Sequence, residues 1–84
     1  MRDDEVLPLV RDAVVLVLEV PAASVQEQTQ LARDLQADSL ALIEIVEVVE
    51  QRLRAAGIVV HVEDEEIERL TTVGDAVELV RGRL

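Results

Sequence analysis

The sequence predicts one all-α domain over residues 1–84: a four-helix bundle with three main helices, a short third helix and a long loop between the first two. Length and composition fit one small domain, because half of the 84 residues are hydrophobic and can fill a modest core. Apolar residues recur at helical spacing in three stretches. Pro21 and Gly57 then separate these stretches from one another.

The first helix is expected before Pro21. Asp3, Asp4 and Glu5 suit a first turn, where acids meet the positive end of the helix dipole. Pro8 is tolerated only near that turn, so the start is open by several residues. Residues 14–18 are also β-prone, but an apolar pattern longer than a dozen residues favours helix. The apolar positions are Val6, Val10, Ala13, Val14, Val17 and Leu18.

Residues 21–38 form a long connection that is rich in Ala, Ser, Gln and Thr. Loops of this length in compact domains are usually functional or carry their own anchors. Leu31 and Leu35 are four residues apart, so we expect them to anchor the loop to the core in a short turn of helix.

The clearest helix is predicted over residues 39–54. One stripe is apolar and consists of Leu42, Ile45, Val46, Val49 and Leu53. The opposite stripe is polar and consists of Glu44, Glu47, Gln51 and Arg54. Gly57 is predicted to end the helix in a left-handed conformation.

Three shorter elements are expected after Gly57. Residues 58–62 are extended in character, and residues 63–70 predict a short acidic helical turn. Thr72 and Asp75 resemble a capping box, with Asp in place of the usual Glu. Four apolar residues then predict the inner face of a last helix: Ala76, Val77, Leu79 and Val80.

The charge is strongly acidic, with 18 acids against 8 arginines, no lysine and a net charge of −10. Nucleic acid and anionic membrane surfaces are therefore poor partners, whereas basic protein surfaces are natural ones. The plain alternative is that the charge only confers solubility. No apolar run approaches the roughly 20 residues that span a bilayer, and the acidic N-terminus differs from a signal peptide. We expect a cytoplasmic protein.

No catalytic or metal-binding constellation is visible, so we expect neither an enzyme nor a metalloprotein. Cysteine is absent, and His61 is a lone histidine without an arranged carboxylate partner. The acids at residues 63–66 lack the alternating ligand spacing of a calcium loop. Ser39 lacks the base and the orienting acid of a hydrolase triad.

The feature with most chemical content is Asp38-Ser39-Leu40, where the long loop meets the clearest helix. A helix N-terminus leaves backbone N–H groups unpaired and carries partial positive charge, so a phosphate ester on Ser39 would lie at a favourable site for an anion. The alternative is that Asp-Ser before an apolar helix is an ordinary N-cap.

Residues 34–40, Asp-Leu-Gln-Ala-Asp-Ser-Leu, resemble the phosphopantetheine attachment motif of acyl carrier proteins, whose usual form is D-L-G-A-D-S-L. The acidic helix after the serine and Leu-Thr-Thr-Val at residues 70–73 follow the order and spacing of that family over most of the chain. The resemblance implies the acyl-carrier bundle.

The resemblance also implies that Ser39 is esterified by 4′-phosphopantetheine, which a phosphopantetheinyl transferase delivers from coenzyme A with Mg²⁺. The thiol of this cofactor carries acyl groups as thioesters. Asp38 is implied as a contact for the transferase. Leu40 and Ile43 flank the attachment point as partner contacts, although a core position is an equal alternative for Ile43.

In the family, the second helix is an acidic docking face for basic patches on ketosynthases and other acyl-processing enzymes. Glu44, Glu47 and Glu50 lie about one turn apart and are the implied contacts here. The alternative is a merely solvated face. We expect the protein to be a monomer when it is alone.

Some positions depart from the family pattern. Gln36 replaces the common Gly and is expected to alter the turn before Asp38, and Leu31 stands where the family often has an aromatic residue. Ala41 stands where fatty-acid carriers often have an acid. Residues 54–62 are longer than the usual turn, and we expect them to lie close to where partners and cargo approach.

These features predict a discrete type II carrier for polyketide biosynthesis. The first alternative is a carrier for fatty-acid synthesis. The alternative from another class is an acidic helical docking module that is never modified. The sequence leaves open whether the acyl chain enters the aliphatic core.

Overall fold

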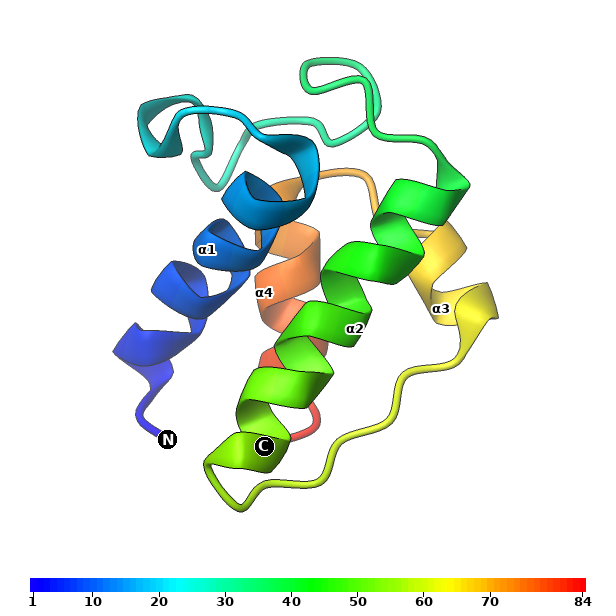
Figure 1. Ribbon diagram of the computed structural model, residues 1–84. Helices are drawn as coiled ribbons and strands as arrows, with labels where there is room; N and C mark the ends of the chain where they lie inside the picture. Colours follow the sequence, from blue (N-terminus) through cyan, green and yellow to red (C-terminus); the bar gives the residue numbers. More distant parts are fainter.

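The computed structural model describes all residues, 1–84, and contains four α-helices and no strand. The α-helices are α1 (Val6–Leu18), α2 (Ser39–Ala55), α3 (Asp64–Glu68) and α4 (Val73–Arg81), and two 3-10 turns cover Asp3–Glu5 and Ala22–Ser24. α1, α2 and α4 form the bundle, and the short α3 lies beside α2 (Figure 1). The predicted all-α fold, with its short third helix and long first loop, is confirmed.

α1 begins immediately after a 3-10 turn that contains the three N-terminal acids, and Pro8 falls in its first turn. The β-prone run is helical up to Leu18. The helix ends three residues before Pro21, because Glu19 adopts the left-handed conformation (φ 55°) and donates its N–H to Val15 O at 2.9 Å. The helix therefore ends at Glu19 and not at Pro21.

The long loop is fixed to the N-terminal end of α4 by backbone hydrogen bonds. Leu31 N donates to Thr71 O (2.8 Å), and Val73 N donates to Thr29 O (2.9 Å). Leu31 is buried in the core, as predicted, and Leu35 is half-buried. Asp34 N closes a single turn on Gln30 O (2.9 Å) that does not continue into a helix.

The core is wholly aliphatic and lies between α1, α2 and α4, with contributions from the loops. The predicted inner stripe of α2 is buried along its whole length. In α4, Val73, Ala76, Val77 and Val80 are buried, and Leu79 is half-buried against the core. No helix combines the length and the apolar character that crossing a bilayer requires.

The end of α2 is a Schellman motif centred on Gly57, which has the predicted positive φ (84°). Gly57 N donates to Arg54 O (2.9 Å) and Ile58 N to Leu53 O (2.8 Å), which satisfies two of the last carbonyls of the helix. Beyond it the chain forms neither helix nor strand until α3. Val60 is buried in this segment and Val59 is exposed.

Residues 54–62 start at the end of α2 that is opposite Ser39, and their expected closeness to partners and cargo stays a prediction. α2 has 17 residues and therefore spans about 25 Å. Ser39 is at one end of it, and the segment leaves from the other end (Figure 1).

Two capping boxes order the C-terminal third. Thr72 and Asp75 form the predicted one, in which each side chain accepts the other residue's backbone N–H at 3.0 Å. The N–H groups of Thr72 and Thr71 lower the pKa of Asp75. The second box joins Glu63 and Glu66 at the start of α3 and was not predicted. An ion pair with Arg83, aided by the N–H of Glu63, lowers the pKa of Glu66.

Candidate functional site

Ser39 is the first residue of α2, is exposed, and has a hydroxyl that makes no hydrogen bond within the chain. The capping role belongs to its neighbour Asp38, which has extended backbone angles and accepts the N–H of Ala41 at Oδ1 (2.8 Å). Asp38 alone therefore caps the helix, and Ser39 takes no part in the cap. Ser39 is left with a free nucleophilic oxygen at the surface.

The turn before Asp38 keeps a glycine-like shape although it contains Gln36. Gln36 has φ 59°, and the next residue, Ala37, is buried and donates its N–H to Leu31 O at 2.9 Å. Gln36 itself takes the left-handed conformation, and the expected alteration of the turn stays a prediction. A side chain in the left-handed region costs about 1–2 kcal/mol, which explains why glycine suits this position better.

The surroundings of Ser39 fit a phosphate ester. The backbone N–H groups of Ser39 and Leu40 belong to the first turn of a 17-residue helix and have no acceptor within the chain. Both the partial charge and the open donors favour an anion there. Leu40 is 63% exposed beside the serine, so an apolar surface adjoins the attachment point.

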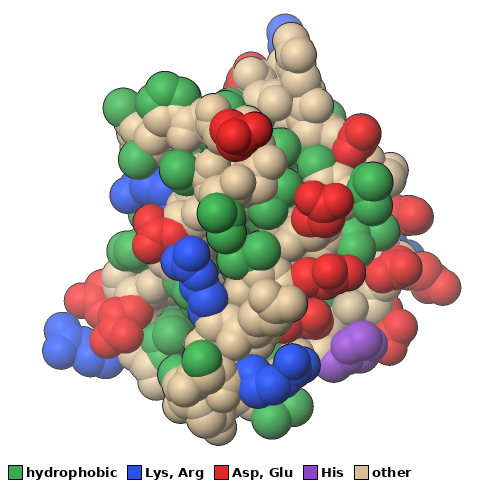
Figure 2. Space-filling model, in the orientation of Figure 1, with side chains coloured by type: hydrophobic (Ala, Val, Ile, Leu, Met, Phe, Trp, Pro, Cys, Tyr) green, Lys and Arg blue, Asp and Glu red, His purple; other side chains and the backbone are tan.

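The three candidate docking acids do not share one environment. Glu44 and Glu47 are exposed and make no hydrogen bond or ion pair within the chain, and Figure 2 shows acidic side chains gathered over α2. The Glu50 side chain is only 16% exposed, and its Oε2 accepts the N–H of Val62 at 2.9 Å. Glu50 therefore holds the segment after α2 in place. Ile43 is half-buried: it packs against the core and keeps part of its side chain accessible, which fits both of its predicted roles, core position and partner contact.

His61 has carboxylate neighbours, so the expectation that it lacks them is wrong. Its Nδ1 lies 3.9 Å from Glu50 Oε2, and its Nε2 lies 3.2 Å from Glu63 Oε1. Glu63 is a local neighbour two residues after His61, whereas Glu50 belongs to α2 and is brought close to His61 only by the fold. No group of three or more metal-ligating side chains is present in the structure.

One open cavity of about 380 Å³ lies between the long loop and α4, away from Ser39. Its lining has a single hydrophobic residue, Val77, and is otherwise polar or glycine. The lining residues are Glu27, Gln28, Thr72, Gly74, Asp75, Val77, Glu78 and Arg81. The cavity is thus unsuited to an acyl chain, and the aliphatic core is closed in this structure.

Comparisons with known proteins agree with this geometry. A family model described as "Phosphopantetheine attachment site" matches residues 8–80. The chain is 32% identical over 81 residues to an acyl carrier protein of Lactobacillus acidophilus, covering 96% of this chain and 95% of that protein. It is 31% identical to an acyl carrier protein of Acidothermus cellulolyticus (95% and 89% covered) and 34% identical to one of Wolinella succinogenes (84% and 87%).

Proposed function

Because the chain belongs to the phosphopantetheine-binding acyl carrier protein family, we propose that Ser39 carries the 4′-phosphopantetheine of this protein and that the chain serves type II polyketide biosynthesis. Members of this family are carriers and not enzymes. The observation that supports the choice of residue is the exposed, unbonded hydroxyl of Ser39 at the first position of α2.

The residues around Ser39 have different proposed roles. Asp38 fixes the start of α2 through its bond to the Ala41 N–H and leaves the carboxylate at the surface for a transferase. Open N–H groups at Ser39 and Leu40 are positioned to bind the phosphate of the attached group. When attached, that group supplies a thiol on a flexible tether, to which acyl intermediates are held as thioesters.

Partner enzymes, namely the phosphopantetheinyl transferase, the ketosynthase and other acyl-processing enzymes, are proposed to bind α2 through basic patches. Glu44 and Glu47 are the contacts of choice, since both carboxylates are free. Leu40 adds an exposed apolar contact, and Ile43 adds the accessible part of its side chain. Glu50 is also proposed to contribute to docking, through the segment that it holds in place.

The choice of pathway rests on Ala41. It follows Ser39-Leu40 where fatty-acid carriers often have an acid, and it is half-buried against the core, so an acid there would be partly desolvated. A carrier for fatty-acid synthesis is the alternative. The proposal also includes a cytoplasmic location and a monomeric state in the absence of partners, both carried over from the sequence.

The deciding experiment is the intact mass of the purified chain after incubation with coenzyme A, Mg²⁺ and a broad-specificity phosphopantetheinyl transferase. We expect a gain of one phosphopantetheine in the wild type and in Ser24→Ala, and no gain in Ser39→Ala. Ser24 is the matched control, because it is the other serine of the chain and its hydroxyl donates to Pro21 O (2.7 Å). Loading that persists in Ser39→Ala would remove the assignment.

If several transferases load nothing and the native host contains no modified form, the unmodified docking module becomes the better description. A docking module should tolerate Ser39→Ala in the producing host, whereas a carrier should lose all activity. For the pathway, the chemical class of the acyl groups released from protein purified from the host separates polyketide from fatty-acid carriage.

A further inference from the structure

The outer ridge of α2 changes character along its length. Leu40, Glu47 and Arg54 are seven residues apart and therefore lie along almost one line of the helix, each exposed to solvent. Successive members of this line are about 10.5 Å apart. The ridge is thus apolar beside Ser39, acidic in its middle and basic at its far end.

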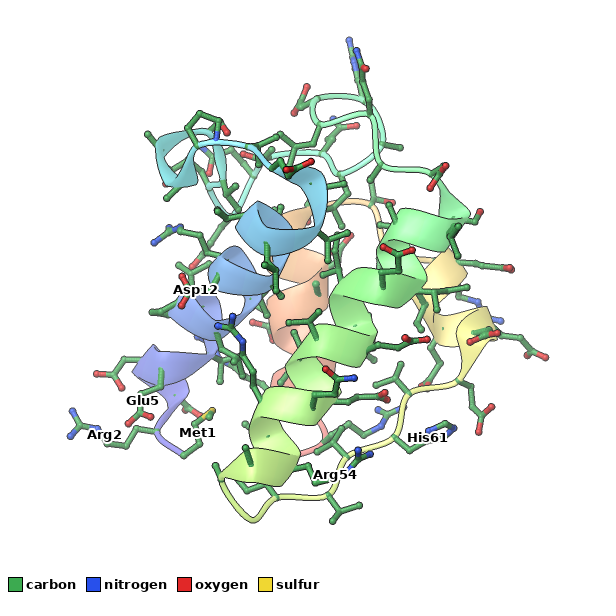
Figure 3. All side chains as sticks on the ribbon, in the orientation of Figure 1. Met1, Arg2, Glu5, Asp12, Arg54 and His61 are labelled. Atoms are coloured by element: carbon green, nitrogen blue, oxygen red, sulfur yellow. The ribbon has the colours of Figure 1, made fainter.

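Arg54 is unpaired, although the protein carries ten more negative than positive charges. Its near neighbour Arg52 lies 3.7 Å from Asp12 across the α1–α2 contact, Nη1 to Oδ2. No carboxylate of the chain forms an ion pair with Arg54. Figure 3 shows Arg54 and His61 at the same pole of the molecule, and Figure 2 shows cationic, histidine and hydrophobic side chains together there.

Val59 is presented at this pole on an ordered segment. It is 82% exposed, which is the largest exposure among the large hydrophobic residues of the chain. The backbone is fixed on one side by the Ile58–Leu53 hydrogen bond and on the other by burial of Val60 and by the Val62–Glu50 hydrogen bond. An apolar side chain that is held in water by anchored neighbours is available for binding at little further entropic cost.

We propose that Arg54 and Val59 form a second contact for the same partner enzyme that binds Glu44 and Glu47. The inference rests on the proposed docking along α2. Charge complementarity defines the occupant: beyond the basic patch that receives the acids, the partner presents an acidic rim around an apolar recess. Two contacts of opposite charge would fix the direction in which α2 lies on the partner, and so aim Ser39 at the entrance of the partner's active site.

The dimensions allow one partner to cover both contacts. A standard interface buries about 800 Å² on each side and is therefore about 30 Å across. That area is about a sixth of the accessible surface of the chain, 5048 Å². The ridge from Leu40 to Arg54 is about 21 Å long and fits within it.

The test is the affinity of the unloaded chain for a purified type II ketosynthase from the same host, measured by titration calorimetry at low salt. Arg54→Glu is expected to raise the Kd at least about fivefold, and Val59→Ser about threefold. Arg2→Glu is the matched control, because Arg2 is exposed on the α1 side (Figure 3) and the substitution changes net charge equally. Leu16→Ser is the control for lost exposed apolar surface on α1.

The sign of the effect decides the outcome. General attraction to a basic partner predicts that Arg54→Glu binds as tightly as Arg2→Glu or more tightly, since both add negative charge. Equal or tighter binding of Arg54→Glu than of Arg2→Glu would overturn the second contact, and so would a wild type that does not bind the ketosynthase.

The unloaded chain is used so that the measured affinity does not depend on loading at Ser39. The Glu44→Arg, Glu47→Arg double variant tests the acidic contact separately. Unchanged far-UV circular dichroism of each variant shows that its fold is intact.

Discussion

The carboxylate of Glu50 accepts the backbone N–H of Val62 across the gap between α2 and the segment that leads to α3. This 2.9 Å bond joins residues that are twelve positions apart, and the Glu50 side chain is largely shielded from water. Glu50 thus stabilises the fold, although it lies on a helix that is rich in exposed acids. The carboxylates of Glu44 and Glu47 on the same helix have no partner within the chain.

Removing this tie should destabilise the fold. Glu50→Ala is expected to lower the free energy of unfolding by about 1.5–2 kcal/mol, because the Val62 N–H loses a charged acceptor. Urea unfolding followed by circular dichroism measures the change. Glu47→Ala on the exposed face is the control and should cost less than about 0.5 kcal/mol. Equal costs for the two variants would contradict the role of Glu50.

The left-handed Gln36 offers a stabilising substitution. Gln36→Gly should raise the free energy of unfolding by about 0.5–1 kcal/mol, since glycine adopts φ 59° without the steric cost, less the entropy that it loses on folding. Gln36→Ala keeps the Cβ and should bring no gain. Thermal unfolding compares the variants, and a lower midpoint for the glycine variant would argue against strain at this position.

The capping box of α4 predicts a dependence of stability on pH. The pKa of Asp75 is lowered by the Thr72 and Thr71 N–H groups, so its contribution is present above the pKa of the unfolded state and is lost as the pH falls through the lower folded value. The stability advantage of wild type over Asp75→Asn should therefore shrink as the pH is lowered from 6 towards about 2.5. Chemical denaturation at several pH values measures it, and an advantage that grows in acid would refute the capping role.

The acidic docking contacts predict an effect on turnover without an effect on structure. Glu44→Arg with Glu47→Arg should slow ketosynthase turnover at low salt several-fold, because two attractive charges become repulsive. Helicity measured by circular dichroism should change little, since both side chains are solvated. The difference from wild type should narrow as salt is added. Unchanged turnover at low salt would remove the docking role.

Local sequence signals predicted much of this architecture. Gly57 ends α2, and Thr72 and Asp75 start α4, because the residues that make these bonds are only a few positions apart. The buried stripe of α2 follows from helical spacing alone. Asp38 and Ser39 were predicted together, but only the structure shows that the cap is Asp38 and that the serine hydroxyl is free.

What the sequence could not predict depends on tertiary contacts. Nothing in the spacing distinguishes Glu50 from Glu47, because the difference arises from a segment that returns along α2 twelve residues later. The same holds for the approach of His61 to Glu50 and for the ion pair of Arg83 with Glu66, which are seventeen residues apart. The left-handed conformation of Gln36 (φ 59°) was not predicted either, because a glutamine seldom adopts it.

The aliphatic core has an optical consequence. With no tryptophan or tyrosine anywhere in the chain, the folded protein is essentially dark at 280 nm and has no intrinsic fluorescence of its own. Any ultraviolet emission from a mixture with a partner therefore comes from the partner alone. A single tryptophan placed at an exposed position such as Leu16 would be the only emitter of the carrier, so that one spectrum would report one site.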